Sequence, residues 1–462
     1  MSTAAAARGP WWLEEAPPDP RLPPLTRRVD AEFVVVGGGY CGLWTALALV
    51  ERNPGTRVVL LEAARCGHGP SGRNGGFLHG YWSSLASARK VFGDAGALAL
   101  ARASSRILPA VRNFAAARDE DIWLREGGML RVAAAPGQEA AVDRAIEAAR
   151  ALGAPEEAVP LSAEGLAARC ASPRFRRGVL FRDGATVHPA RLARALRRAV
   201  LDAGVEVFEN SPARVRGTSV ETPSGRARAQ QVVLAVNSAA VQERALARCL
   251  TNAGSHVVLT EPVPDLVARL GWTGGEAIVD ARIFLHYFRT TPDGRVLMGS
   301  AAGALARGGR GGFDRDRAAE ARAEAALRRL LPGFGGVRVE AAWGGPVDVS
   351  VDGFPFVGTL DGGRVHYAAG FSGNGVGPSW LAAQALASLA TRTEDEWTSL
   401  PLVGRRPRRR LPPEPWKHAG GRAVRAATLR VEDADEAGEP APLWARTGAA
   451  LPRLLGVRLG TR

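Results

Sequence analysis

The sequence predicts an α/β fold of two joined domains: a discontinuous Rossmann-like domain and a second, α+β domain with a mixed sheet. Length is the first observation, because 462 residues are about three times the size of a typical domain. Composition is the second: 46% hydrophobic and 23% charged residues suit a sizeable core and exclude global disorder. The third is a short β-branched run, three glycines and an apolar helix near the N-terminus.

Hydrophobic periodicity and turn residues predict the elements in order. Residues 1–30 contain six prolines and are expected to form an extended arm on the surface. Residues 31–62 are typical of strand, glycine turn, helix and strand, and a glycine-rich loop follows over 63–82. Further helices are predicted over 94–118, 137–152, 189–203, 314–331 and 376–390, a hairpin over 214–231, and further strands over 129–132, 205–208, 231–236, 257–260, 282–289, 295–299, 337–343 and 366–369.

The uncharged run from Phe33 to Val50 meets the length criterion for a membrane span. The glycines at 37–39 interrupt it, so a strand followed by a helix is the better interpretation. The four cysteines form no C-x-x-C pair, and no His/Asp/Glu cluster has metal-ligand spacing, which argues against a disulfide framework and a metal site. Because the first residues contain no apolar h-region, we expect no secretory signal and a cytoplasmic protein.

Positive charge is concentrated at the C-terminus. The net charge is +14, and Lys90 and Lys417 are the only lysines, so arginine supplies nearly all of the basic residues. Residues 401–462 carry 13 basic and 6 acidic residues. We interpret the arginine bias as genome composition and the segment 396–462 as a solvated, partly helical basic tail. RNA or membrane binding through this tail is the alternative.

The glycine turn has the pattern of a dinucleotide site. Gly37, Gly39 and Gly42 fit G-x-G-x-x-G between the strand 31–36 and an apolar helix, which is the context that the motif requires. The free N–H groups of a helix N-terminus there would bind phosphates. Glu62 ends the next strand 20 residues after Gly42, where an acid accepts hydrogen bonds from ribose hydroxyls and repels a 2′-phosphate.

The loop over 66–76 distinguishes among dinucleotides, because a nicotinamide enzyme would continue with further strand–helix units. Instead the loop carries five glycines, which would let backbone amides line a large planar group. The chain resembles the glycine oxidase/D-amino acid oxidase superfamily of flavoproteins over roughly residues 31–392, and within it the γ-glutamylputrescine oxidase-like branch. The resemblance is carried by the late segment Gly370–Val376 and by the run of Ser71, Gly72, Arg73, Asn74, Gly75 and Gly76.

The resemblance implies FAD as the cofactor. Adenosine would lie at Gly37–Gly42 and Glu62, and the loop Ser71–Gly76 beside the pyrophosphate and flavin. The helix that begins near Val376 would point its N-terminus at the N1/O2 edge of the flavin, where positive potential stabilises the reduced, anionic form. Gly373, Gly375 and Val376 match the family there, whereas Asn374 stands where the family often has histidine. Some relatives attach FAD covalently, so Cys66, His68 and His79 are candidates, with non-covalent FAD as our expectation.

The implied reaction is oxidation of a C–N bond in an amine or amino acid to an imine. Hydride passes to flavin N5, and O2 or another acceptor reoxidises the flavin. Tyr287 and Arg289 lie two apart on a predicted strand, so both face one side, and Arg289 could clamp a carboxylate. Trp343 resembles a family strand end near the flavin, and Asp348 and Asp352 could attract a cationic amine. Polyamine derivatives, N-methyl amino acids and D-amino acids all fit as substrates.

The domain boundaries follow from this comparison. The FAD-binding domain would use residues 31–95, 180–245 and 342–395, and the substrate domain residues 96–179 and 246–341. Flavin monooxygenases share the first motif, but the late Gly-Asp segment of that family is absent from this sequence and Gly373–Gly375 occupies its place. Monooxygenation is therefore the second alternative to amine oxidation.

Overall fold

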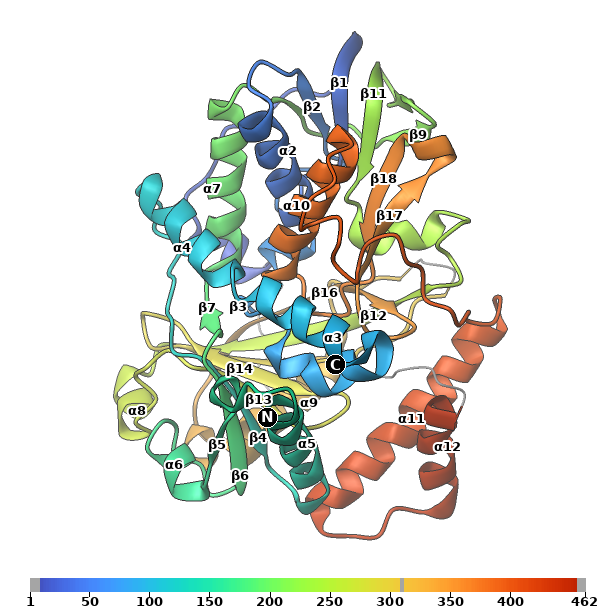
Figure 1. The fold of residues 1–462 in the computed structure, drawn as a ribbon. Coiled ribbons are helices and arrows are strands. Elements are labelled where there is room, and N and C mark those ends of the chain that lie inside the picture. The colour runs from blue at the N-terminus through green and yellow to red at the C-terminus, as the bar shows by residue number, and fades with distance from the viewer. Residues whose placement is uncertain (1–8, 308–310, 455–462) are drawn as a thin grey trace.

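The structure is a computed structural model that describes residues 9–307 and 311–454. In these residues the strands form two eight-stranded sheets and a two-stranded ribbon of β3 (Phe77–Leu78) and β7 (Ala185–Thr186) (Figure 1). The helices of this part are α1 (Trp11–Glu15), α2 (Tyr40–Arg52), α3 (Leu85–Ser104), α4 (Ile107–Ala117), α5 (Glu139–Ala151), α6 (Ala163–Ala167), α7 (Pro189–Asp202), α8 (Pro264–Arg269), α9 (Arg317–Leu330), α10 (Pro378–Thr391), α11 (Trp416–Ala437) and α12 (Leu443–Leu454).

The first sheet is mostly parallel. Its strands run in the order β17 (Phe356–Leu360), β18 (Val365–Ala369), β11 (Arg226–Leu234), β1 (Arg28–Val36), β2 (Val58–Leu61) and β8 (Glu206–Phe208), with β10 (Ser219–Glu221) and β9 (Arg214–Arg216) attached to β11. Only the pairings of β17, β10 and β9 are antiparallel in this sheet. Alternation along β1 places Val35 in the hydrophobic cluster shared with α2, α7 and α10, and Val34 in a cluster on the other face. This is a Rossmann-like arrangement.

The second sheet is mostly antiparallel. Its order is β16 (Val339–Ser350), β12 (Leu250–Thr260), β15 (Val296–Ser300), β14 (His286–Thr290), β13 (Ala277–Asp280), β4 (Met129–Ala133), β6 (Arg177–Phe181) and β5 (Val159–Leu161). The pairing of β13 with β4 is parallel, which makes the sheet mixed as predicted. Helix α9 contributes Ala323, Leu327 and Leu330 to the core cluster that also contains Phe288 of β14.

Most predicted elements are present, but several boundaries are wrong. The helix predicted over 94–118 is two helices, and α3 begins at Leu85 with a break at Gly93, whose φ is 72°. The strand predicted at 257–260 begins at Leu250, in a polar stretch that gave no strand signal. Residue 282 lies outside β14, because a turn precedes His286 in which Asp280 accepts both the Arg282 and the His286 backbone N–H.

Other corrections concern the chain segment that contains β16 and β17. The expected strand at 337–343 continues to Ser350, so Trp343 lies in the middle of β16 rather than at a strand end, and the expected domain boundary at 342 falls inside this strand. Strand β17 was not predicted. We retain the two-domain division as a proposal in which each domain is built on one sheet and β16 belongs to the second.

The arm and the tail are more ordered than expected. The described part of the N-terminal arm begins with α1, which buries Trp12 completely against Trp343 and His188. Residues 17–26 form no helix or strand, and most of them are exposed, as expected of an extended surface arm. The C-terminal tail forms α11 and α12, which pack against each other beside the second sheet (Figure 1). Among the described residues no helix combines the length and the apolar composition that a membrane crossing requires.

Candidate active site

A cavity of 480 Å³ lies between the two sheets, at the carboxyl ends of the parallel strands. Val36 ends β1 and Leu61 ends β2, and Ala235 follows β11; all three line the cavity. The opposite wall comes from β12, β14 and β16 of the second sheet. Ligands in open α/β sheets bind at this edge of the strands, where loops leave the sheet in opposite directions.

The glycine turn forms the floor of the cavity. Gly37 has a φ of 112°, and a Cβ there would lie 2.3 Å from the Ala235 carbonyl oxygen. A Cβ at Gly42 would lie 1.9 Å from the Gly37 carbonyl oxygen, so only glycine lets α2 pack this closely on the turn. Gly37 and Gly39 line the cavity, whereas Gly42 lies beneath the turn and does not. These are the roles that the motif predicts for the three glycines.

Glu62 lines the same end of the cavity. Its carboxylate accepts hydrogen bonds from the Gly38 N–H at 2.7 Å and the Ala64 N–H at 2.9 Å, and burial raises its pKa. Each carboxylate oxygen can accept more than one hydrogen bond. Glu62 is therefore oriented by the backbone and retains acceptor capacity for the hydroxyl groups of a ligand.

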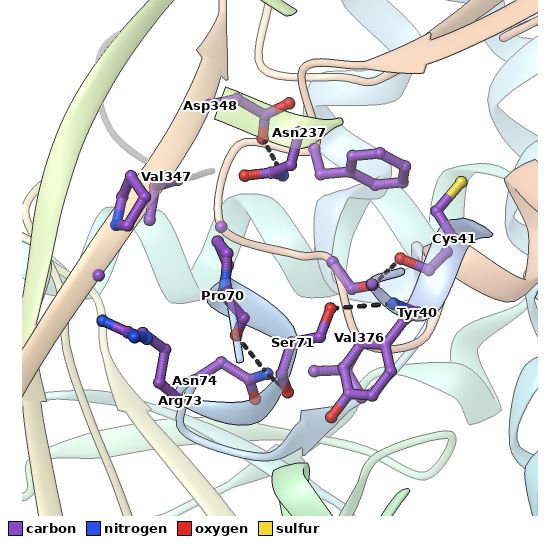
Figure 2. Close-up of a pocket in the computed structure, with 18 of the residues that line it drawn as sticks. Tyr40, Cys41, Pro70, Ser71, Arg73, Asn74, Asn237, Val347, Asp348 and Val376 are labelled. Atoms are coloured by element: carbon purple, nitrogen blue, oxygen red, sulfur yellow. Dashed lines mark hydrogen bonds between the residues drawn. The ribbon is translucent and has the colours of Figure 1, made fainter. Parts of the chain in front are cut away.

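The loop over Ser71–Gly76 forms the side wall. Ser71 Oγ accepts the Tyr40 backbone N–H at 2.9 Å, which fixes the loop against the start of α2 (Figure 2). Asn74 donates to the Pro70 and Ser71 carbonyls and accepts from the Gly76 N–H at 2.7 Å. Ser71, Arg73, Asn74 and Gly75 line the cavity. Gly72 and Gly76 do not line it, because they pack against neighbouring backbone.

Arg73 links this loop to the second domain. Its guanidinium donates to the His68 carbonyl at 2.9 Å and pairs with Asp314 at 2.5 Å. Its own carbonyl accepts the Nε1–H of Trp343 at 2.7 Å. Trp343 lines the cavity, and Trp12 of the N-terminal arm packs edge-on against it at 6.1 Å.

The segment over Gly373–Val376 forms the far end of the cavity, immediately before α10, and all four of its residues line it. The buried carboxyl of Asp348 accepts the Gly370 N–H at 2.6 Å and the Asn237 Nδ2–H at 3.0 Å, across the cavity from Ser71 in Figure 2. Burial raises the pKa of Asp348 to about 7. Asp348 therefore holds the cavity wall, and the expectation that it attracts a cationic amine is not supported by its contacts.

Some of the predicted substrate residues line the cavity and others do not. Tyr287 lines the cavity, and its hydroxyl lies 2.8 Å from Ser255 Oγ. Arg289 points to the same side of β14, but it is fully buried and does not line the cavity. Its guanidinium donates to the carbonyls of Val187, at 2.5 Å, and Gly76, at 3.4 Å. Arg289 thus supports the end of the loop Ser71–Gly76 from behind the cavity wall, which does not favour its predicted role as a carboxylate clamp. Asp352 pairs with Arg405 and also lies off the cavity.

Sequence reasoning missed part of the wall. Residues 211–213, 235–237 and 239 line the Glu62 end, and Ser255, Val279, Leu285 and Ala301 line the Tyr287 end. The first group follows the carboxyl ends of β8 and β11, so the rule for open α/β sheets could have located it. Of the three candidates for covalent attachment, only His79 lines the cavity.

The structure also brings together Asp280, His286 and Glu436, a group with the geometry to hold a metal ion that sequence spacing did not reveal. His286 Nδ1 lies 2.6 Å from Asp280, and Glu436 pairs with the guanidinium groups of Arg282 and Arg329. These neighbouring cations already balance the carboxylates, so we interpret the group as an ion-pair cluster.

The cavity fits an extended dinucleotide. Asn237 Oδ1 and Asn374 Oδ1 are buried, and neither has a hydrogen-bond partner among the described residues, although both residues line the cavity. Each offers an acceptor to a ligand N–H or O–H. A Cβ at Gly375 would meet nothing closer than Phe371 Cβ at 3.9 Å, so this glycine is not required by packing within the protein. It instead allows a ligand to approach the backbone closely.

Comparison with known proteins identifies the ligand class. The DAO family of FAD-dependent oxidoreductases matches residues 32–389. Gamma-glutamylputrescine oxidoreductase of Escherichia coli K12 is 30% identical over 372 residues, which cover 79% of this chain and 84% of that protein. The probable oxidoreductase OrdL of Haemophilus influenzae is 25% identical over 405 residues, covering 84% and 89% of the two chains.

Solved structures agree on the fold. Glycine oxidase from Geobacillus kaustophilus superposes with a TM-score of 0.65 at 23% identity and covers 79% of this chain and 96% of its own. L-proline dehydrogenase from P. horikoshii superposes with a TM-score of 0.66 at 19% identity and covers 81% and 96%. These findings confirm the predicted family, fold class and cofactor. The chain belongs to the DAO family of FAD-dependent oxidoreductases and is an enzyme that uses FAD.

Proposed function

We propose that this enzyme oxidises the C–N bond of an amine or amino acid to an imine, with FAD in the cavity described above. The observation that carries the proposal is the continuity of one cavity from Glu62, at the dinucleotide motif, to Tyr287 on the second sheet. Gly37, Gly39, Glu62, Ser71 and the segment Gly373–Val376 would hold FAD. When bound, FAD accepts the hydride from the carbon beside nitrogen, and O2 or another acceptor restores it.

The substrate end would bind the amine in its uncharged form. Phe77, Val257, Val279, Leu285 and Ala301 make this part of the wall apolar. The carboxyls that line the described cavity belong to Glu62 and Asp348, and backbone N–H groups hold both of them. An ammonium ion would lose its hydration here without gaining a counter-charge, so burial favours the neutral amine. A neutral amine also has the free electron pair that supports loss of hydride.

The wall favours an amine without a carboxylate on the carbon beside nitrogen. Arg73 supplies the guanidinium that lines the described cavity, and the His68 carbonyl and Asp314 already occupy it. Arg289 lies behind the loop Ser71–Gly76 and does not line the cavity. The similarity to an oxidoreductase named for gamma-glutamylputrescine supports an amine, whereas the likeness to glycine oxidase and proline dehydrogenase supports an amino acid. The wall chemistry supports the amine.

A steady-state panel tests the proposal. It pairs amines with their α-carboxylated analogues, adds N-methyl and D-amino acids, and detects the carbonyl product and the released nitrogen compound. We expect amines to turn over at least about tenfold more efficiently than the analogues, since a buried unpaired carboxylate costs more than 1.4 kcal/mol. Comparable or better turnover of the analogues would overturn the assignment to amines.

Two variants of β14 make the test specific to the site. Tyr287→Phe removes the hydroxyl that bonds to Ser255 and should lower kcat/KM for the preferred amine without changing the FAD content. Phe288→Leu alters the next residue of the strand, which faces the core cluster and does not line the cavity. It should lower thermal stability and leave kcat/KM unchanged. Unchanged kcat/KM in Tyr287→Phe together with a lower kcat/KM in Phe288→Leu would show that the substrate binds elsewhere.

A further inference from the structure

Helix α12 presents an exposed apolar face. Leu443, Trp444, Leu451 and Leu454 expose 76%, 60%, 46% and 79% of their surface. With 100° between successive residues, these four side chains fall within an arc of about 100°. The opposite side of the helix is buried, through Ala445 and Pro452. Seven large hydrophobic side chains are exposed in the described chain, and five of them belong to α11 and α12. Exposed apolar side chains are therefore concentrated on these two helices, which is typical of an interaction surface.

The position of this face is fixed by ion pairs of α11. Glu432 and Glu436 pair with Arg282, whose side chain is almost completely buried, and Asp433 pairs with both Arg282 and Arg322. These contacts hold α11 against the second domain. α12 packs on the other side of α11, where a Cβ at Gly448 would lie 2.7 Å from Ala427 Cβ. Helix α12 therefore lies at the side of the molecule (Figure 1), and its apolar face is exposed to solvent.

The same ion pairs leave the outside of the tail basic. Glu432, Asp433 and Glu436 of α11 are turned toward Arg282 and its neighbours, and Asp435 accepts the Gly137 N–H. Arg422, Arg430 and Arg446 are exposed and form no salt bridge with a residue that the structure describes. Helix α12 contains no acidic residue. Both helices lie beyond residues 32–389, the region that matches the family.

A helix with this face and these charges is typical of segments that lie in a membrane interface. Leucine and tryptophan enter the boundary between headgroups and acyl chains, and arginine pairs with anionic headgroups. A nucleic acid would satisfy the arginines but leave the four apolar side chains in water. A second copy of the chain would bring two arginine-flanked faces together. We propose that α12 docks this enzyme on the surface of an anionic lipid bilayer, with its apolar face in the interface.

Flotation of the FAD-loaded, full-length enzyme with lipid vesicles tests the proposal. We expect binding to vesicles of equimolar phosphatidylcholine and phosphatidylglycerol, little binding to phosphatidylcholine alone, and loss of binding as salt screens the arginines. The combined variant Leu443→Ser, Trp444→Ser and Leu454→Ser should lower the partition coefficient by about a hundredfold. Arg446→Glu should lower it by about tenfold.

The matched control is Val91→Ser, which removes an exposed apolar side chain of α3 and should leave vesicle binding unchanged. Turnover of a water-dissolved amine should be unchanged in every variant, because α12 does not line the cavity, and this also shows that the variants are folded. The proposal is overturned if the wild-type enzyme binds neither vesicle type. It is equally overturned if the serine variant binds like wild type. Serine-sensitive self-association, or retention on RNA, without vesicle binding would assign the face to another partner.

Discussion

Replacing Asp348 by asparagine tests how the cavity wall is held. In the folded protein the buried carboxyl has a pKa of about 7, against 3.8 for the free group. Between these values the unfolded chain is ionised while the folded protein keeps the proton, so this group's contribution to stability falls as pH rises from about 4 to 7. At 1.36 kcal/mol for each pKa unit, the difference corresponds to about 4 kcal/mol.

Asparagine at this position cannot ionise, yet its side chain can still accept the Gly370 N–H. Its amide can donate to Asn237 Oδ1, which has no partner among the described residues. We expect Asp348→Asn to match wild type near pH 4 and to be more stable by up to about 4 kcal/mol at pH 8.

The assay is urea unfolding across this pH range with FAD in excess. Asp183 is half-buried, and desolvation raises its pKa to about 7 as well, so Asp183→Asn tests the same effect at a position away from the cavity. Identical pH profiles for Asp348→Asn and wild type would refute the reasoning, because the wall carboxyl would then be ionised throughout.

Three further substitutions probe the FAD site, each read as the FAD dissociation constant from flavin fluorescence. Glu62→Gln should weaken FAD binding by about tenfold to a hundredfold, since hydrogen bonds to a charged acceptor are worth about 1.5–3 kcal/mol; unchanged affinity would place the ribose elsewhere. Gly375→Ala should weaken FAD binding and leave the melting temperature of the FAD-free protein unchanged, because the methyl group enters the cavity without a protein clash; a lower melting temperature would indicate a packing role. Arg289→Lys should weaken FAD binding because the loop Ser71–Gly76 loses its support. It should also change kcat/KM equally for substrates with and without a carboxylate. A selective loss of kcat/KM for carboxylated substrates would instead show that Arg289 binds the substrate carboxylate.

Local sequence patterns located one end of the cavity, at the glycine turn and Glu62. The spacing of Gly37, Gly39 and Gly42 is a demand of the turn itself, and Glu62 follows from the length of one strand–helix–strand unit. Such short-range geometry depends only on residues that are close together in the sequence. The loop Ser71–Gly76 and the segment Gly373–Val376 came from family resemblance, and the structure brings both to the same cavity.

Long-range contacts could not be predicted in this way. Tyr287 and Arg289 share one side of β14, but only the fold shows that Gly75 leaves Tyr287 facing the cavity while Val187 and Gly76 bind the Arg289 guanidinium. The role of Asp348 depends on Gly370, which is 22 residues distant. The order of the tail depends on the pairing of α11 acids with Arg282, about 150 residues earlier in the sequence. The tail is partly helical and mostly exposed, as expected, but a charge count alone could not show that α11 docks on the second domain.

The central claim is that FAD in this cavity removes hydride from an amine. The most direct measurement is the visible absorption spectrum of the purified enzyme, kept free of oxygen, as amines and their carboxylated analogues are added in turn. We expect a flavin band that bleaches with an amine and not with its carboxylated analogue. Admission of air then distinguishes an oxidase from a dehydrogenase by how quickly the band returns. Bound flavin that no amine bleaches would contradict the proposed chemistry, and a protein that cannot be loaded with FAD would contradict the site.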